Sequence, residues 1–275
     1  MTTPTLSEFA GARAQITAYE WAAPDPRYLV LLLHGFGEHL GRYQHVADAL
    51  VAHGATVVGP DHLGHGRSGG ERVLIERVED LLEDAHAVWE RAHERHPGLP
   101  TVLIGHSMGG HLGARHALEH RDELAAVVLS APVIGKIDIV DATLTLPEIP
   151  DVPLPPEALS RDPAVGAAYA ADPLVWHGGF ARATLESFSV SNRRILESGS
   201  LGDLPLLWVH GTSDPLIPRE DARVGVDAIA GDIREDRSYE GGMHESFNEV
   251  DSTDVIDDVV DFIERHVLDG GRAPR

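Results

Sequence analysis

The pentapeptide GHSMG occupies residues 105–109, with Ser107 at its centre. The pattern G-x-S-x-G is typical of a catalytic serine when it joins a strand to a helix, because the sharp turn strains the serine backbone and lifts its hydroxyl above the sheet. An apolar run at 101–104 precedes the turn, and a helix-compatible stretch at 110–120 follows it. This context predicts that Ser107 is a nucleophile. A serine that only caps a helix N-terminus is the structural alternative.

A serine hydroxyl is a weak nucleophile at neutral pH and needs a base that is itself oriented by a carboxylate. Asp214 follows the predicted strand 206–209, and His244 follows the predicted strand 234–239 in a glycine-flanked turn. Both lie at the carboxyl ends of strands, where an open α/β sheet places its active site. We therefore expect them to form a catalytic triad with Ser107. Three other aspartates precede or lie within their strands and are rejected: Asp203, Asp232 and Asp236.

Acyl transfer also needs hydrogen-bond donors aimed at the negative charge that develops on the carbonyl oxygen. The backbone N–H of Met108, directly after the nucleophile, occupies one expected position. The backbone N–H of Phe36, in the glycine loop at 34–39, occupies the other. Because the backbone supplies both donors, the side chains remain free, and we expect the ring of Phe36 to border the acyl pocket.

The sequence predicts no cofactor and no metal site. Zero cysteines exclude disulfides and thiolate ligands. His116 and His120 have the i, i+4 spacing of a metal-binding pair, but no third ligand stands near them in sequence, so we expect an exposed, metal-free pair. The acidic residues at 76–84 alternate with apolar ones at helical spacing and are interpreted as the solvated face of a helix.

The elements that must position these residues alternate between strands and helices, which predicts an α/β fold with a mostly parallel central sheet flanked by helices. The run 28–33 is apolar on both faces, as a strand buried between two helical layers must be. The segment 15–21 is expected to be an edge strand. Further strands are predicted at 55–60, 101–104, 124–129, 206–209 and 234–239, and helices after residues 43, 78, 110, 218 and 254.

Some seventy residues separate the strands near 124–129 and 206–209, far more than a structureless loop would span. We expect residues 131–203 to form an inserted cap, or lid, on a core made of residues 1–130 and 204–275. The proline-rich stretch at 147–156 predicts an irregular border, with one helix after Pro163 and another over about 180–197. Six apolar residues line an entrance or only pack the cap onto the sheet: Ile134, Ile137, Ile139, Val140, Leu144 and Leu146. Residues 269–275 are expected to be a polar tail.

Composition excludes several partners. The formal charge of −22, from 44 acidic and 22 basic residues, disfavours nucleic acid and an electrostatic hold on anionic lipid, since both need a basic surface. No span approaches the roughly 20 apolar residues of a membrane helix, and residues 1–10 lack the features of a secretory signal. A cytoplasmic protein is expected, and the sequence leaves its oligomeric state open.

Taken together, the motifs resemble the monoacylglycerol lipase family of α/β-hydrolases, in which the triad has the order Ser, Asp, His. The resemblance rests on 34–39 (HGFGEH), 41–43 (GRY), 61–68 (DHLGHGRS), 105–110 (GHSMGG), 210–214 (HGTSD) and 244–249 (HESFNE). It implies the triad and the oxyanion donors assigned above, and a cap over a tunnel for one acyl chain. Glu38 and Arg42 match polar positions near the family's glycerol-binding end, or they only brace their loop. The position of Phe36 often carries a smaller residue in the family.

The resemblance implies a serine hydrolase that cleaves monoacylglycerols to fatty acid and glycerol through an acyl-enzyme, with at most transient contact between its cap and a membrane surface. A lysophospholipase, a short-chain carboxylesterase and an aminopeptidase share the fold and the mechanism. An aminopeptidase needs acidic side chains in the cap to bind the ammonium group of its substrate. The predicted cap contains three candidates: Glu148, Asp151 and Glu157. A receptor that binds a hydrophobic ligand without turning it over is the alternative of a different class.

Overall fold

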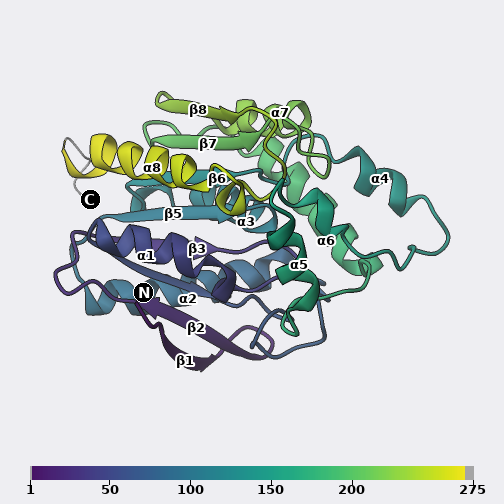
Figure 1. Cartoon of the computed structure of the whole chain (residues 1–275), viewed down its shortest axis with the longest axis horizontal. Helices are drawn as coiled ribbons and strands as arrows, with labels where there is room; N and C mark the ends of the chain where they lie inside the picture. The colour runs from purple at the N-terminus through teal and green to yellow at the C-terminus, as the bar shows by residue number, and fades with distance from the viewer. Residues whose placement is uncertain (1, 270–275) are drawn as a thin grey trace.

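The computed structural model describes residues 2–269 and contains one eight-stranded sheet between two layers of helices (Figure 1). The strand order is β1-β2-β4-β3-β5-β6-β7-β8, and the strands from β3 to β8 run parallel. Their bounds are β1 (Thr5–Ala10), β2 (Gln15–Trp21), β3 (Tyr28–Leu33), β4 (Ala55–Pro60), β5 (Thr101–His106), β6 (Ala126–Ser130), β7 (Leu206–Gly211) and β8 (Arg234–Tyr239). The predicted α/β architecture is confirmed.

Helices cover both faces of the sheet because its central strands are apolar on both faces. Along β3, Leu29, Leu31 and Leu33 pack into one core, and Val30 and Leu32 pack into the other, as the two-residue period of a strand requires. In Figure 1, α1 (Gln44–Ala52) and α8 (Ser252–Ile263) lie in front of the sheet, and α2 (Val78–Arg95) and α3 (Met108–Glu119) lie behind it. The helix α7 (Arg219–Ile229) contributes to the same core as α2 and α3.

The prediction that segment 15–21 forms the edge strand is wrong. It is β2, which lies between β1 and β4 and pairs antiparallel with both. The true edge is β1, which the sequence analysis did not predict. Five of its six residues are exposed and only Phe9 is buried, so the strand lacks the apolar alternation by which a half-buried strand is recognised.

The segment predicted to be the cap carries three helices, α4 (Asp138–Leu144), α5 (Pro163–Ala171) and α6 (Arg182–Glu197). The last two were predicted, whereas the short α4 was not. Along α6, Asn192 exchanges two hydrogen bonds with the backbone of Gly135, and Ser191 accepts one from Arg115 of α3. Because α6 packs on core helices, the division at residues 131–203 stays a prediction. The predicted tail lies outside the described residues beyond residue 269.

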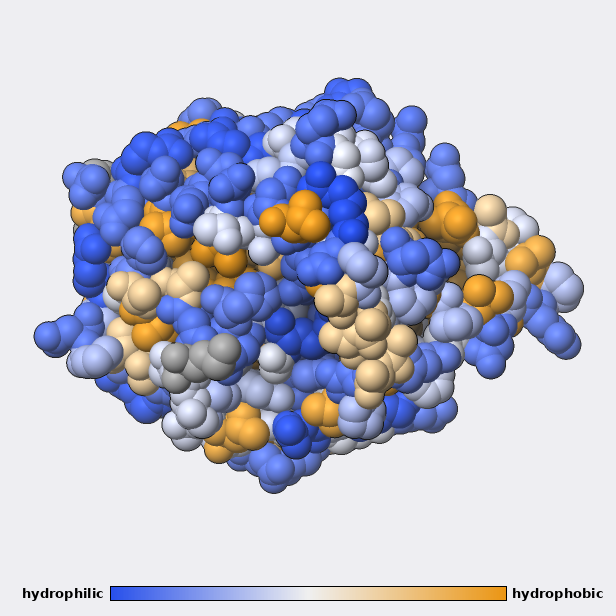
Figure 2. Space-filling model, in the orientation of Figure 1, coloured by the Kyte–Doolittle hydropathy of each residue, from blue (hydrophilic) through white to orange (hydrophobic). Residues whose placement is uncertain are grey.

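The six apolar residues of this segment differ in burial, and two of them, Val140 and Leu144, are half-buried. Ile134 and Ile137 are buried, which fits packing onto the sheet, whereas Ile139 is 73% exposed and Leu146 is 42% exposed. Figure 2 shows apolar side chains gathered on the protruding arm where Figure 1 places α4, beside an otherwise largely hydrophilic face. Over residues 2–269, none of the helices has both the length and the apolar character needed to cross a bilayer.

Candidate active site

Ser107 sits in a strained turn between β5 and α3. Its backbone angles are φ 54° and ψ −114°, a combination that L-residues rarely adopt. A Cβ at Gly105 would lie 2.1 Å from the backbone oxygen of Gly109, and a Cβ at Gly109 would lie 2.1 Å from that of Leu33. Only glycine therefore fits on either side, as the G-x-S-x-G pattern predicts. The serine hydroxyl does not cap the helix, so the structural alternative is wrong.

The structure brings Ser107, His244 and Asp214 together in one chain of hydrogen bonds, although they are separated by up to 137 positions in sequence. The Oγ of Ser107 lies 2.9 Å from Nε2 of His244, and Nδ1 of His244 lies 2.8 Å from Oδ2 of Asp214. All three residues are buried. A carboxylate, an imidazole and a hydroxyl in this order can move a proton from the serine to the histidine.

The surroundings of Asp214 keep it ionised. Burial alone would raise its pKa, but the charge of His244 and hydrogen bonds from His210 and His244 hold that pKa well below its usual range. Its Oδ1 accepts the backbone N–H groups of Leu216 and Ile217, both at 2.9 Å. Burial would likewise lower the pKa of His244, but Asp214 outweighs it and raises that pKa above 6.5.

His210 is a site residue that had no role assigned from the sequence, although it begins the HGTSD motif. Its Nε2 lies 3.2 Å from Oδ2 of Asp214 and 2.9 Å from the backbone oxygen of Ile217. Its Nδ1 accepts a hydrogen bond from Nε1 of Trp208, so the neutral ring carries its proton on Nε2. His210 therefore faces the same carboxylate oxygen, Oδ2, as His244 does.

The backbone N–H groups of Phe36 and Met108 stand in the two loops that were predicted to stabilise an oxyanion. Within residues 2–269 neither group donates a hydrogen bond to a backbone or side-chain acceptor. The neighbouring Gly35 differs, since its N–H donates to Oε1 of Glu38 at 2.6 Å and so anchors the loop. Two unpaired donors next to Ser107 are what a developing oxyanion needs.

Glu38 and Arg42 belong to a buried ionic network. Oε1 of Glu38 accepts hydrogen bonds from Gly35 N–H and from the Tyr43 hydroxyl, and Oε2 accepts one from Arg42 at 2.5 Å. The Arg42 guanidinium also holds both carboxylate oxygens of Glu245, at 2.7 and 2.8 Å. Sequence reasoning missed this last pair, because its partners lie 203 positions apart. The only signal was the presence of Glu245 directly after His244.

A cavity of only about 20 Å³ lies over Ser107, far smaller than the roughly 300–1,000 Å³ of ligand pockets in general. It is lined by Gly35, Phe36, Glu38, His106, Ser107, Leu154, Leu159, Tyr169, His244 and Glu245. The ring of Phe36 stacks on Phe180 at 4.2 Å and joins the oxyanion loop to the segment before α6. Backbone hydrogen bonds from Trp176 to Gly37 and from Glu245 to Leu159 close the cavity further.

The expectation of an exposed pair at His116 and His120 is wrong. His116 is 1% exposed, and the side chain of His120 is only 30% exposed. A third imidazole, that of His86 in α2, lies beside them. The sequence analysis missed it because it stands 30 positions before His116, on another helix.

Comparison with known proteins places the chain in a family. Residues 24–251 match the family described as serine aminopeptidase, S33. The chain is 38% identical to a monoacylglycerol lipase of Mycolicibacterium smegmatis over 97% of its length and 100% of the relative. It is 29% identical to human monoglyceride lipase, over 80% of this chain and 76% of the human one.

A solved structure agrees with this placement. The monoacylglycerol lipase of Paleococcus ferrophilus superposes with a TM-score of 0.77 at 27% identity, covering 90% of this chain and 98% of that one. The family match spans most of the chain, and the M. smegmatis relative aligns over nearly all of it. The chain therefore belongs to this family of α/β-hydrolases, which is the family of the monoacylglycerol lipases.

Proposed function

We propose that this protein hydrolyses monoacylglycerols to fatty acid and glycerol, with Ser107 as nucleophile. One observation carries the proposal: the Ser107 hydroxyl lies 2.9 Å from a buried imidazole that is itself 2.8 Å from a buried carboxylate. The activity of the relatives supports the substrate class, since proteins named monoacylglycerol lipase align along nearly the whole chain.

In the proposed reaction, Ser107 attacks the ester carbonyl while His244 takes its proton at Nε2. The N–H groups of Phe36 and Met108 donate to the oxyanion, each contributing about 3 kcal/mol in the transition state. His244 then protonates the departing glycerol oxygen, which leaves an acyl-enzyme on Ser107. A water that gives its proton to His244 attacks this ester, and His244 returns that proton to Oγ of Ser107 as the fatty acid leaves. Asp214 holds the proton of neutral His244 on Nδ1 throughout.

We propose that Glu38 borders the end of the cavity that receives glycerol, and that Arg42 holds Glu38 and Glu245 in place there. Glu38 lines the cavity, and its second role is to anchor the oxyanion loop through Gly35. The acyl chain needs more room than the cavity provides, and we propose that the cavity widens when Phe36, which lines it, separates from Phe180. The stacked pair then acts as the contact that opens when a lipid enters.

An aminopeptidase activity is disfavoured by the charges around the cavity. The three cap acids that the sequence offered are exposed and do not line it: Glu148, Asp151 and Glu157. The two carboxylates that do line it, Glu38 and Glu245, are both paired with Arg42. All four oxygens of these two carboxylates already accept hydrogen bonds, so a substrate ammonium would find no free carboxylate oxygen beside Ser107.

We propose that residues 138–152, which contain α4 and are called the α4 arm, make transient contact with the lipid surface that holds the substrate. Three of the eight large exposed apolar side chains of residues 2–269 belong to this arm: Ile139, Leu146 and Val152. Zwitterionic vesicles should retain the native protein in a flotation assay. Ile139→Ser should reduce that retention, whereas Leu6→Ser, at an exposed position of the edge strand β1, should not. Equal retention of both variants would contradict a role for the arm.

The test of the proposed function compares kcat/KM for a long-chain monoacylglycerol with kcat/KM for a butyrate ester. Binding energy from the long acyl chain, remote from the reacting carbonyl, should raise kcat/KM for the monoacylglycerol. A strong preference for the monoacylglycerol is expected, with Ser107→Ala as the blank. A preference for the butyrate would make the protein a short-chain carboxylesterase. A fluorophosphonate probe should label the native protein and not Ser107→Ala, and an unlabelled, folded native protein would favour a hydrophobic-ligand receptor.

A further inference from the structure

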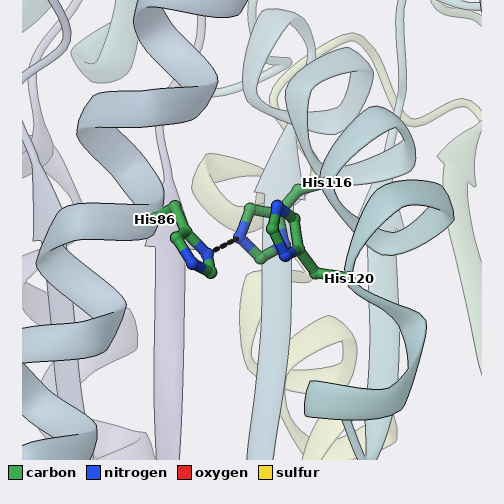
Figure 3. Close-up of side chains that lie close together, drawn as sticks. All are labelled: His86, His116 and His120. Atoms are coloured by element: carbon green, nitrogen blue, oxygen red, sulfur yellow. Dashed lines mark hydrogen bonds between the residues drawn. The ribbon is translucent and has the colours of Figure 1, made fainter. Parts of the chain in front are cut away.

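Three histidines from two helices meet behind the sheet, at a distance from the catalytic serine (Figure 3). His86 comes from α2, His116 from the last turn of α3, and His120 from the residue that ends α3. One ring nitrogen of each lies within 4.8 Å of those of the other two. In Figure 3 the His86 ring faces the rings of His116 and His120 across the gap between the helices.

The spacing of two of these nitrogens fits a tetrahedral metal site. Nδ1 of His86 lies 3.3 Å from Nε2 of His116. Two nitrogens that bind one Zn²⁺ at the usual bond length, with tetrahedral angles, stand about 3.3 Å apart. An ion placed between them would replace the hydrogen bond that now joins the two rings.

A carboxylate completes a set of four ligands. Oε2 of Glu123 lies 3.8 Å from Nδ1 of His86, and Oε1 lies 3.4 Å from Nδ1 of His120. Three imidazoles and one carboxylate are donors that suit Zn²⁺.

We propose that His86, His116, His120 and Glu123 bind one Zn²⁺ ion, which joins α2 to α3. The ion can enter from solvent, because the side chains of His86 and His120 are 22% and 30% exposed.

Binding requires one local movement. The rings of His86 and His120 are stacked at 4.1 Å and only 23° from parallel, so their lone pairs do not converge on one point. His120 is the residue that moves, since it ends its helix and is partly exposed. Rotation of its ring turns a nitrogen toward the ion while His86 and His116 keep their places.

The proposed ion is structural and has no part in the ester chemistry. Along α3, the nine residues from Ser107 to His116 correspond to about 13 Å of helix, so the ion cannot touch the reacting atoms. It connects residues that the unfolded chain does not hold together, and therefore it stabilises the folded state.

The first experiment titrates Zn²⁺ into protein freed of metal by chelation, followed by calorimetry and thermal unfolding. One ion per chain is expected, with a rise in Tm of roughly 5–10 °C when free Zn²⁺ is 100-fold above Kd. Mg²⁺ should produce no rise, because it prefers oxygen ligands. If Zn²⁺ does not bind, or binds without raising Tm, the proposal is overturned.

The second experiment locates the ion. His120→Gln removes a partly exposed ligand, so the variant should fold, and it should bind Zn²⁺ at least about tenfold more weakly. Glu123→Gln should also weaken binding. The matched control is His53→Gln, an exposed histidine after α1 that lies outside the cluster and should leave the affinity unchanged. Unchanged affinity in His120→Gln would mean that other histidines hold the metal, and it would overturn the proposal.

Co²⁺ provides a direct view of the coordination, since four-coordinate Co²⁺ has much stronger visible absorption bands than the hydrated ion. The native protein and His53→Gln should show these bands, and addition of Zn²⁺ should abolish them. Spectra of the hydrated ion in the native protein would contradict a four-ligand site.

Discussion

Replacement of Asp214 by asparagine tests the catalytic site through the position of a single proton. Oδ1 of Asp214 accepts two backbone N–H groups, and Oδ2 faces Nδ1 of His244 and Nε2 of His210. Asparagine has the same shape but only one acceptor oxygen. The structure therefore decides which side of the amide faces the catalytic histidine.

Two orientations of the amide are available. If its oxygen faced His244, the amide nitrogen would oppose two buried N–H groups, each of which would lose an acceptor at a cost of about 1–3 kcal/mol. If its oxygen keeps the two N–H groups, the amide nitrogen faces His244 and opposes only His210, which still donates to the backbone oxygen of Ile217. The second orientation leaves two fewer donors unpaired, and we expect it to dominate by roughly tenfold or more.

In that orientation the amide donates to Nδ1 of His244, so the imidazole proton moves to Nε2. Nε2 then cannot accept the proton of Ser107, although the distances are unchanged. We expect kcat to fall about 10⁴-fold, or roughly 5 kcal/mol in the activation free energy. KM should change little, because Asp214 does not line the cavity.

The assay measures kcat and KM on a chromogenic butyrate ester, with thermal unfolding to establish that Asp214→Asn is folded. The matched control is Asp232→Asn, the same change at an exposed aspartate before β8, which should keep the native kcat. A folded Asp214→Asn protein with kcat within tenfold of the native value would refute the reasoning. A comparable loss in the control would show that the effect does not depend on His244.

Three further predictions concern pH and packing. Because Asp214 raises the pKa of His244, kcat/KM should rise with pH through a midpoint above 6.5; a flat profile from pH 5 to 9 would contradict His244 as the base. Gly109→Ala places a Cβ 2.1 Å from a backbone oxygen of β3 and should lower Tm by about 6 °C or more. At Gly98 an added Cβ would meet no atom within 4 Å, so Gly98→Ala should lower the free energy of unfolding by only about 1–2 kcal/mol, because Gly98 has a positive φ. An equal fall in Tm for Gly98→Ala and Gly109→Ala would argue against crowding at the turn around Ser107. Burial raises the pKa of Asp84 from 3.8 to about 6, so the folded chain binds this proton more tightly than the unfolded chain, and stability falls as pH rises between these values. Asp84→Asn should therefore raise Tm at pH 8 and hardly change it at pH 4. An equal change in Tm at the two pH values would show that the charge of Asp84 does not cause the stabilisation.

Much of the candidate site was predictable because each part has a local signature. The turn around Ser107 combines a buried strand, two glycines and a helix within about twenty residues, and the structure has the strained φ that this pattern implies. Asp214 and His244 were selected because each follows a strand, and the parallel sheet brings the ends of β7 and β8 to the same edge as Ser107. These inferences needed only neighbouring residues and the rule that parallel strands end together.

Elements without a strong apolar pattern were missed. The edge strand β1 is almost fully exposed, so its sequence resembles a loop, and its position changes β2 from an edge strand to an interior one. The helix α4 has seven residues, none of them buried, which is too short and too exposed for helical periodicity to be recognised.

The sequence by itself determined the fold class, the buried strands and the residues able to perform acyl transfer, because periodicity, glycine position and motif order are properties of adjacent residues. Only the tertiary structure decided which distant groups meet: Arg42 with Glu245, Phe36 with Phe180, and His86 with His116. Histidine occurs 17 times in this chain, and nothing in the local sequence of His86 distinguishes it from the others. Such contacts depend on how helices and loops pack on the sheet, and this packing cannot be inferred from any short segment of the sequence.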